Sequence, residues 1–134
     1  MTKAGADILI VDDEADIRKL IRGILEDEGY VTRSASGAKQ AYEEIAKDKP
    51  DLIVLDIWLQ GSDHDGLQIL EKVKADYPEI PILMISGHGT IETAVAAIKQ
   101  GAYDFIEKPF KSDRLILVAK LALGAYQLGM DDDK

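Results

Sequence analysis

Acidic side chains follow two apolar segments of this chain, at the points where those segments end. Asp12, Asp13 and Glu14 come directly after the apolar run 8–11, and Asp56 follows a second such run. Uninterrupted apolar runs are typical of strands in a parallel sheet, whose carboxyl ends meet at one edge, so we expect four carboxylates to converge there. Carboxylates about 4 Å apart repel by about 4 kcal/mol at an effective dielectric near 20. A hard divalent cation relieves that repulsion, and the donor set predicts a Mg²⁺ site.

Two other interpretations of the acidic segment are weaker. A nucleotide- or flavin-binding protein would carry a loop rich in Gly or Ser/Thr here, presenting backbone N–H groups to phosphate. The acidic loop instead disfavours an anion. Asp12 or Asp13 could cap the following helix, where Asp is favoured. One residue is enough for capping, so three acidic residues in a row favour the metal site.

A hydroxyl and an ammonium group are predicted at the same edge of the sheet. Ser86 follows the apolar segment 80–85, and Lys108 follows the segment 103–106. An acceptor carboxylate, a metal, a hydroxyl and a fixed cation are the groups that phosphoryl transfer to an aspartate requires. Mg²⁺ and Lys108 would neutralise the oxygens of the transferring group while Asp56 attacks in line. Each signal alone is weak, and the prediction rests on their joint occurrence.

Five strand segments alternate with five segments of helical periodicity. The runs 8–11, 52–55 and 80–85 have the composition of strands covered on both faces, whereas 31–35 and 103–106 mix polar with apolar residues and are predicted edge strands. The alternation predicts an α/β fold, a doubly wound (βα)5 unit with a parallel five-stranded sheet of order 2-1-3-4-5 and right-handed crossovers. The expected helices lie around residues 17–25, 38–45, 67–73, 91–98 and 115–122.

The composition bounds the class of protein. The chain has 134 residues, 46% hydrophobic and 31% charged, which is typical of one globular domain. It has no Cys, which excludes thiol catalysis, thiolate zinc sites and disulfides, and fits a cytoplasmic location. A net charge of -9 repels nucleic acid and anionic lipid. We therefore expect no direct nucleic-acid binding and no membrane span or secretion signal.

The motifs at the four strand ends resemble those of a known family, the receiver domains of bacterial two-component response regulators. The resemblance covers about residues 6–124 and is carried by Val11-Asp-Asp-Glu14, Leu55-Asp-Ile57, Ile85-Ser-Gly87 and Ile106-Glu-Lys-Pro-Phe110. More narrowly, 56–62, 85–89 and 101–110 resemble the NtrX type, nitrogen regulators of the NtrC family. The resemblance implies a flavodoxin-like, CheY-like fold.

The resemblance also implies a role for each residue of the predicted metal site. Asp56 would be the phospho-acceptor. Asp12, Asp13 and Asp56 would hold Mg²⁺ together with the backbone carbonyl of Trp58.

Three further residues acquire implied roles in the response to phosphorylation. Ser86 would contact the phosphoryl group and Lys108 would pair with it, with a cis bond between Lys108 and Pro109. Phe105 falls at the aromatic switch position, where many family members carry Tyr. His88, between two glycines beside this site, is interpreted as a loop residue rather than a phosphoryl ligand.

The predicted function is a signalling switch rather than an enzyme. A phosphohistidine on a sensor histidine kinase would donate to Asp56, and the domain would catalyse only its own phosphorylation and dephosphorylation. A phosphohydrolase using an aspartyl phosphate usually needs a second acid two residues after the nucleophile, where this chain has Trp58. A pseudo-receiver that serves only in dimerisation is disfavoured by the intact set of site residues.

One departure from the family pattern concerns the loop after Asp56. The family commonly has Pro four residues and Gly eight residues after the acceptor, whereas this chain has Gln60 and His64. Asp65-Gly66 comes two residues late, so the loop is about two residues longer, and the position of the third helix is open.

The last helix predicts an interaction surface. Apolar residues between Leu115 and Leu123 lie all round it, and only one face can cover the sheet. We therefore expect a homodimer through the fourth helix, fifth strand and fifth helix. Residues 1–126 are assigned to the receiver domain, and 127–134 to a C-terminal tail that is either an added segment or a truncated linker. The last four residues, 131–134, resemble a protease-tag remnant. Output segments with ATPase and DNA-binding functions are expected to follow in the complete protein and to regulate transcription.

Overall fold

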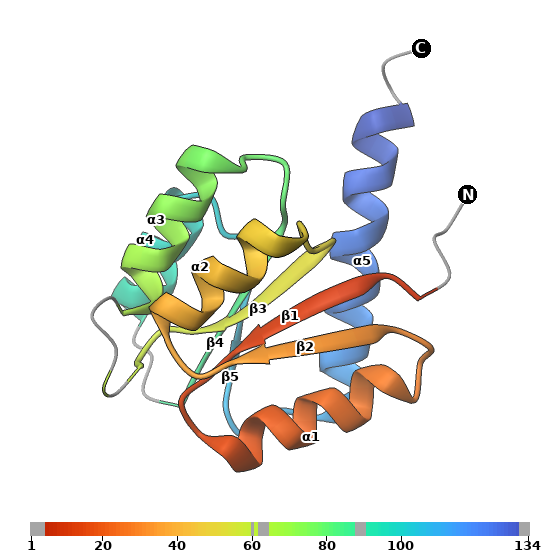
Figure 1. Cartoon of the computed structure of the whole chain (residues 1–134), viewed down its shortest axis with the longest axis horizontal. Coiled ribbons are helices and arrows are strands. Elements are labelled where there is room, and N and C mark those ends of the chain that lie inside the picture. The colour runs from red at the N-terminus through yellow and green to blue at the C-terminus, as the bar shows by residue number, and fades with distance from the viewer. Residues whose placement is uncertain (1–4, 60, 62–64, 88–90, 132–134) are drawn as a thin grey trace.

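Five parallel strands form the single sheet of the described part of the chain. The computed structural model describes residues 5–59, 61, 65–87 and 91–131 (Figure 1). The strand order is β2-β1-β3-β4-β5, which confirms the predicted topology. The strands are β1 (Asp7–Val11), β2 (Val31–Ala35), β3 (Leu52–Asp56), β4 (Ile82–Ser86) and β5 (Asp104–Glu107).

Helices cover both faces of this sheet, as a parallel sheet requires. They are α1 (Ala15–Glu26), α2 (Ala38–Lys47), α3 (Gly66–Asp76), α4 (Ile91–Lys99) and α5 (Ser112–Asp131). Helices α2, α3 and α4 pack on one face, and α1 and α5 pack on the other (Figure 1). None of the helices in the described residues is long and apolar enough to cross a membrane.

The core follows from the alternation of side chains along each strand. Leu9 and Val11 of β1 join the cluster beneath α2, α3 and α4, whereas Ile8 and Ile10 join the cluster beneath α1 and α5. Every residue of β3 and β4 is buried. Burial on both faces explains why these strands are apolar without interruption, and it makes a polar residue at their ends conspicuous in the sequence.

The strand register brings the ends of β1, β3 and β4 to one edge. Val11 is paired with Leu55, and Asp56 is paired with Ile85. Asp12 and Asp56 therefore leave adjacent strands at the same level of the sheet.

Two element boundaries differ from those expected. Strand β4 begins at Ile82, because Pro81 has no N–H for the ladder and contributes only its carbonyl, which accepts from the Ile53 N–H at 3.1 Å. Helix α5 continues to Asp131, so the expected boundary at 126 lies within a helix. The division into domain and tail stays a prediction.

Candidate functional site

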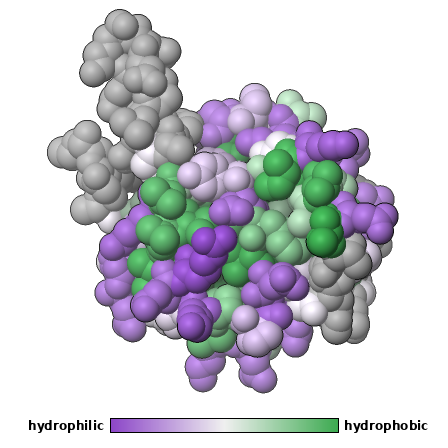
Figure 2. Space-filling model, turned by 180° about the vertical axis from the view of Figure 1, so that it is seen from behind, coloured by the Kyte–Doolittle hydropathy of each residue, from purple (hydrophilic) through white to green (hydrophobic). Residues whose placement is uncertain are grey.

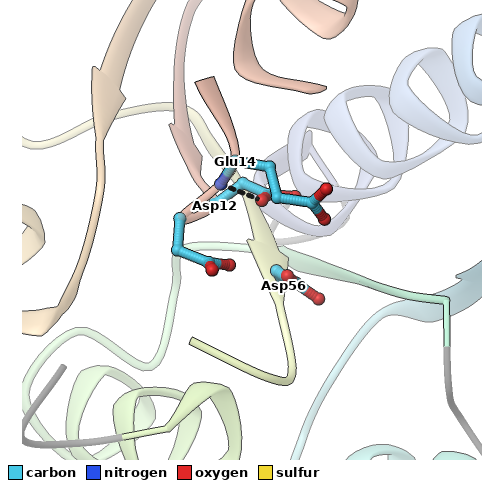
Figure 3. Close-up of side chains that lie close together, drawn as sticks. Asp12, Glu14 and Asp56 are labelled. Carbon is cyan, nitrogen blue, oxygen red and sulfur yellow. Dashed lines mark hydrogen bonds between the residues drawn. The ribbon is translucent and has the colours of Figure 1, made fainter. Parts of the chain in front are cut away.

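Four carboxylates gather at the carboxyl edge of the sheet, as the sequence predicts. Asp12, Asp13 and Glu14 from the β1–α1 loop and Asp56 from the end of β3 each offer an oxygen, and these oxygens lie within 4.8 Å of one another. Figure 3 shows three of these side chains close together at the strand ends. Asp12 is completely buried and Asp56 is 3% exposed, whereas Glu14 is exposed. The cluster is open to solvent on one side and buried on the other, which fits a metal held by a partial protein shell completed by water.

Asp12 is fixed by hydrogen bonds from all of its polar groups. Its N–H donates to the Ala35 carbonyl at 3.1 Å, and its carbonyl accepts from Arg18 Nη1 at 2.7 Å. Its Oδ1 accepts from the Glu14 N–H at 2.8 Å (Figure 3), and its Oδ2 accepts from Lys108 Nζ at 2.9 Å. A carboxylate held this way is positioned before any cation arrives.

The helix-capping interpretation of the acidic segment is wrong. The N-cap residue of α1 is Glu14, and its side chain makes no capping hydrogen bond. Asp12 bonds to the backbone N–H two residues on, which forms a turn rather than a cap. Neither Asp12 nor Asp13 therefore occupies the capping position, and the three acidic residues remain available to a cation.

Asp56 is the most perturbed carboxyl group of the site. Burial raises its pKa, and the nearby charge of Asp12 raises it further, whereas the charge of Lys108 and the Trp58 N–H, 3.4 Å from Asp56 Oδ1, oppose the shift. The result is a pKa of about 6. Ionising Asp56 therefore costs more free energy than ionising an ordinary aspartate, and a cation beside it would lower that cost.

Lys108 is the cation that the chain itself supplies. Its Nζ lies 2.9 Å from Asp12 Oδ2 and 3.5 Å from both Glu14 Oε1 and Asp56 Oδ2. Burial lowers the pKa of Lys108, but the hydrogen bond to Asp12 and the surrounding carboxylates outweigh burial and raise it. One ammonium among four carboxylates leaves the site short of positive charge, so these residues fit a divalent cation.

The remaining predicted residues lie around this cluster. Ser86 ends β4, is fully buried, and accepts from the Lys108 N–H at 2.8 Å through its carbonyl. Phe105 on β5 is partly buried against the cluster of α2, α3 and α4. Trp58 is 45% exposed beside Asp56, and the Lys108–Pro109 bond is cis, as expected. The roles of Ser86, Phe105 and the Trp58 carbonyl stay predictions.

The position of α3, which the longer loop after Asp56 left open, is defined by hydrogen bonds at the start of this helix. Gln60, His64 and His88 lie outside the described residues. Asp65 caps α3 through a reciprocal pair of hydrogen bonds with Gln68, and the Gly66 N–H donates to the Ile57 carbonyl at 2.7 Å. Helix α3 therefore begins directly against the backbone that follows Asp56, despite the longer loop.

Three residues at this site were not among the predicted ligands. Glu14, placed with the acidic segment but not among the ligands, belongs to the cluster geometrically. Arg18 and Gly66 contact the backbone of Asp12 and of Asp56, respectively. Glu14 can be recognised in the sequence because it belongs to an acidic triplet. Arg18 and Gly66 cannot be recognised in this way, because a contact with backbone atoms requires no particular sequence motif.

Known proteins match nearly the whole chain. The family described as "Response regulator receiver domain" matches residues 8–120. The nitrogen assimilation regulatory protein NtrX of Azorhizobium caulinodans is 62% identical over 122 residues, covering 91% of this chain and 27% of that protein. The DNA-binding transcriptional regulator NtrC of Escherichia coli is 30% identical over 120 residues, covering 90% of this chain and 25% of the relative. The chain thus spans about a quarter of the length of the curated relatives it matches.

Solved structures of receiver domains have the same fold as this chain. The receiver domain of NtrX from Brucella abortus has a TM-score of 0.86 and 63% identity, covering 88% of this chain and 98% of that one. The beryllofluoride-activated NtrC4 receiver domain dimer has a TM-score of 0.84 and 40% identity, covering 90% of this chain and 98% of that one.

Proposed function

The chain belongs to the response regulator receiver family, in which it is similar to the receiver domains of NtrX proteins, and on that premise we propose that it is a phosphorylation-dependent switch. The proposed donor is the phosphohistidine of a sensor histidine kinase. The observation that carries the proposal is Asp56, buried at a strand end with Asp12 and Lys108 against it. This arrangement gives one nucleophilic carboxylate a cation on one side and metal-ligating oxygens on the other.

The chemistry assigned to this chain is attack by one carboxylate oxygen. The Asp56 oxygen forms a bond to phosphorus while the phosphorus–nitrogen bond of the donor breaks, and the imidazole leaves with the electron pair. Asp12, Asp13 and Asp56, with the Trp58 carbonyl and water, would hold Mg²⁺, which supplies charge neutralisation for the transferring oxygens. Lys108 lies within reach of Asp56 and adds a second positive charge.

The proposed response begins with the new charge of about -2 on Asp56. Ser86, at the adjacent strand end, would contact the phosphoryl group, and Phe105 would repack beside it. A balance between two packings needs only a few kcal/mol of differential interaction. Output segments beyond this chain, with ATPase and DNA-binding functions, would then regulate transcription in nitrogen metabolism, in the cytoplasm.

Incubation with Mg²⁺ and acetyl phosphate is expected to add one phosphoryl group to the protein. Asp56→Asn removes the nucleophile and should abolish the gain, because an amide oxygen forms no stable acyl phosphate. Intact-mass spectrometry measures the gain directly. Asp16→Asn, in the exposed first turn of α1, is the matched control and should be phosphorylated like the wild type. Phosphorylation of Asp56→Asn at the wild-type level would refute the proposed acceptor.

The proposed dimer interface is the face of α4, β5 and α5. Among the side chains that the structure describes, six large apolar ones are exposed on these elements or directly before β5, and Ile91 is 84% exposed. Figure 2, which views the molecule from behind, shows apolar groups exposed on this side, interrupted by polar side chains. The other five are Val95, Ile98, Tyr103, Leu117 and Leu121. A dimer would remove this apolar surface from water.

Beryllofluoride, an acyl-phosphate mimic, is expected to shift the protein from monomer toward dimer in sedimentation. Leu117→Glu should suppress the shift, because it places a charge in the proposed interface. Leu20→Glu is the matched control, since Leu20 on α1 is 50% exposed and Leu117 is 53% exposed. Equal loss in both variants, or a monomer at every concentration of the activated wild type, would count against this interface.

A further inference from the structure

Arg18 joins helix α1 to the metal-site loop. It lies in the second turn of α1 and is partly buried. Its Nη1 donates to the carbonyl oxygen of Asp12 at 2.7 Å, across six residues of sequence. At this distance a guanidinium–carbonyl hydrogen bond is short and charge-assisted, and so among the stronger ones.

This bond differs in kind from the bond between Lys108 and Asp12. Lys108 binds Oδ2 of Asp12, an oxygen that a cation would also bind, so the two compete. Arg18 binds the backbone carbonyl and leaves both carboxylate oxygens to a metal. The bond from the Asp12 N–H to Ala35 likewise involves no carboxylate oxygen. Asp12 is therefore held on both sides of its Cα independently of what its carboxylate binds.

We propose that Arg18 is a positioning residue for the metal site, and that its bond to the Asp12 carbonyl sets the affinity for Mg²⁺. The inference rests on the metal site of the proposed function. Without this bond, part of the ordering of the Asp12–Glu14 loop would have to come from metal binding, at the expense of affinity. Residues outside the ligand set of metal sites commonly act in this way, and their loss costs about 10- to 100-fold in affinity.

The sign of the effect separates positioning from simple electrostatics. Arg18 is a positive charge near four carboxylates, and by charge alone its removal should tighten the binding of a dication. Loss of positioning should weaken binding. The two explanations thus predict opposite changes in the Mg²⁺ dissociation constant.

The test compares Arg18→Met with Arg22→Met. Both variants remove one positive charge from α1. The Arg22 side chain, however, bonds to Thr32 Oγ1 at 3.2 Å and pairs with Glu26 at 3.6 Å, and makes neither bond with the metal-site cluster. The Mg²⁺ dissociation constant is measured by calorimetry and by the fluorescence of Trp58, the only Trp of the chain. We expect Arg18→Met to raise it about tenfold, and Arg22→Met to leave it within about twofold of the wild type.

A second readout separates binding from chemistry. At saturating Mg²⁺, the rate of phosphorylation by acetyl phosphate in Arg18→Met should return to within about threefold of the wild type, because Arg18 touches no reacting atom. Arg18→Lys, which keeps a charged donor, should recover part of the affinity. If Arg18→Met does not fold, Arg18→Gln replaces it with the same expected direction.

The outcomes are distinct. Unchanged or tighter Mg²⁺ binding in the neutral Arg18 variant would overturn the inference and leave the proposed function intact. Equal weakening in Arg22→Met would also overturn it, because the effect would then be general to α1. A wild-type protein that binds no Mg²⁺ would instead refute the metal site on which both proposals depend.

Discussion

Asp56→Asn is expected to make the metal-free protein more stable at pH 7, even though it removes the proposed acceptor. The raised pKa of about 6, against an ordinary value of 3.8, means that ionising Asp56 in the folded state opposes folding. At 1.36 kcal/mol per pKa unit, the cost at pH 7 is at most about 3 kcal/mol. Asn has nearly the same shape and no charge, and the main partner of Lys108, Asp12 at 2.9 Å, remains in place.

The pH dependence gives this prediction a definite sign. Because the folded pKa lies above the unfolded value, the wild type loses stability as pH rises from about 4 to 6, whereas Asp56→Asn lacks this loss. The free energies of unfolding of the two proteins should therefore diverge across that window and run parallel above it. Urea unfolding in a chelating buffer at pH 4, 5, 6 and 7 measures the divergence.

Two controls make the test of Asp56 specific. Asp16→Asn, at an exposed position, should follow the wild type at each pH. Added Mg²⁺ should stabilise the wild type more than Asp56→Asn, because the variant lacks one of the carboxylates proposed to bind the metal. A variant less stable than the wild type at pH 7 without metal would mean that pairing with Lys108 outweighs the burial of the charge.

Gly66→Ala is expected to destabilise the protein by about 3 kcal/mol, the upper range of overpacking effects. A Cβ at Gly66 would lie 2.1 Å from the Asp56 carbonyl oxygen and 2.6 Å from Ile57 Cα. Both contacts are with backbone atoms, so no side chain can rotate away. Helix α3 or the segment after Asp56 must move, and Mg²⁺ affinity should fall together with the free energy of unfolding.

Gly23→Ala is the matched control for Gly66→Ala. Gly23 lies in the exposed interior of α1, and a Cβ there would meet nothing within 4 Å. Ala should therefore stabilise this helix by roughly 0.5–1 kcal/mol. Urea unfolding of both variants, with calorimetric Mg²⁺ titration, makes the comparison. If Gly66→Ala also stabilised the protein, helix propensity rather than contact with the Asp56 backbone would decide the result at Gly66.

Much of the fold and the cluster was predictable because it depends on periodicity and on strand ends. The runs 8–11 and 52–55 indicate strands covered on both faces, and parallel strands end at one edge. Asp12 and Asp56 are therefore brought together by topology alone. Burial inside such a sheet also makes every polar residue at a strand end a visible exception.

The contacts that refine the site were not predictable, because they depend on angles and distances rather than on residue type. Whether Arg18 reaches the Asp12 carbonyl depends on how α1 leaves the loop, and an Arg on an exposed helix face has the same sequence signature. Gly66 could be recognised as a helix start but not as a close contact with Asp56, because the loop between them departs from the family spacing. Glu14, by contrast, was expected among the four carboxylates at this edge, and the turn at Asp12 accounts for its position.

The position of Lys108 also bears on which ions the site accepts. Its ammonium already lies 2.9 Å from Asp12 and 3.5 Å from Asp56, so an incoming ion has to compete with a tethered positive charge. Na⁺ or K⁺ would replace one unit charge by another and gain little, whereas a divalent ion adds a net charge to a site that still lacks it. Lys108 would thus favour a divalent over a monovalent ion at the proposed metal site.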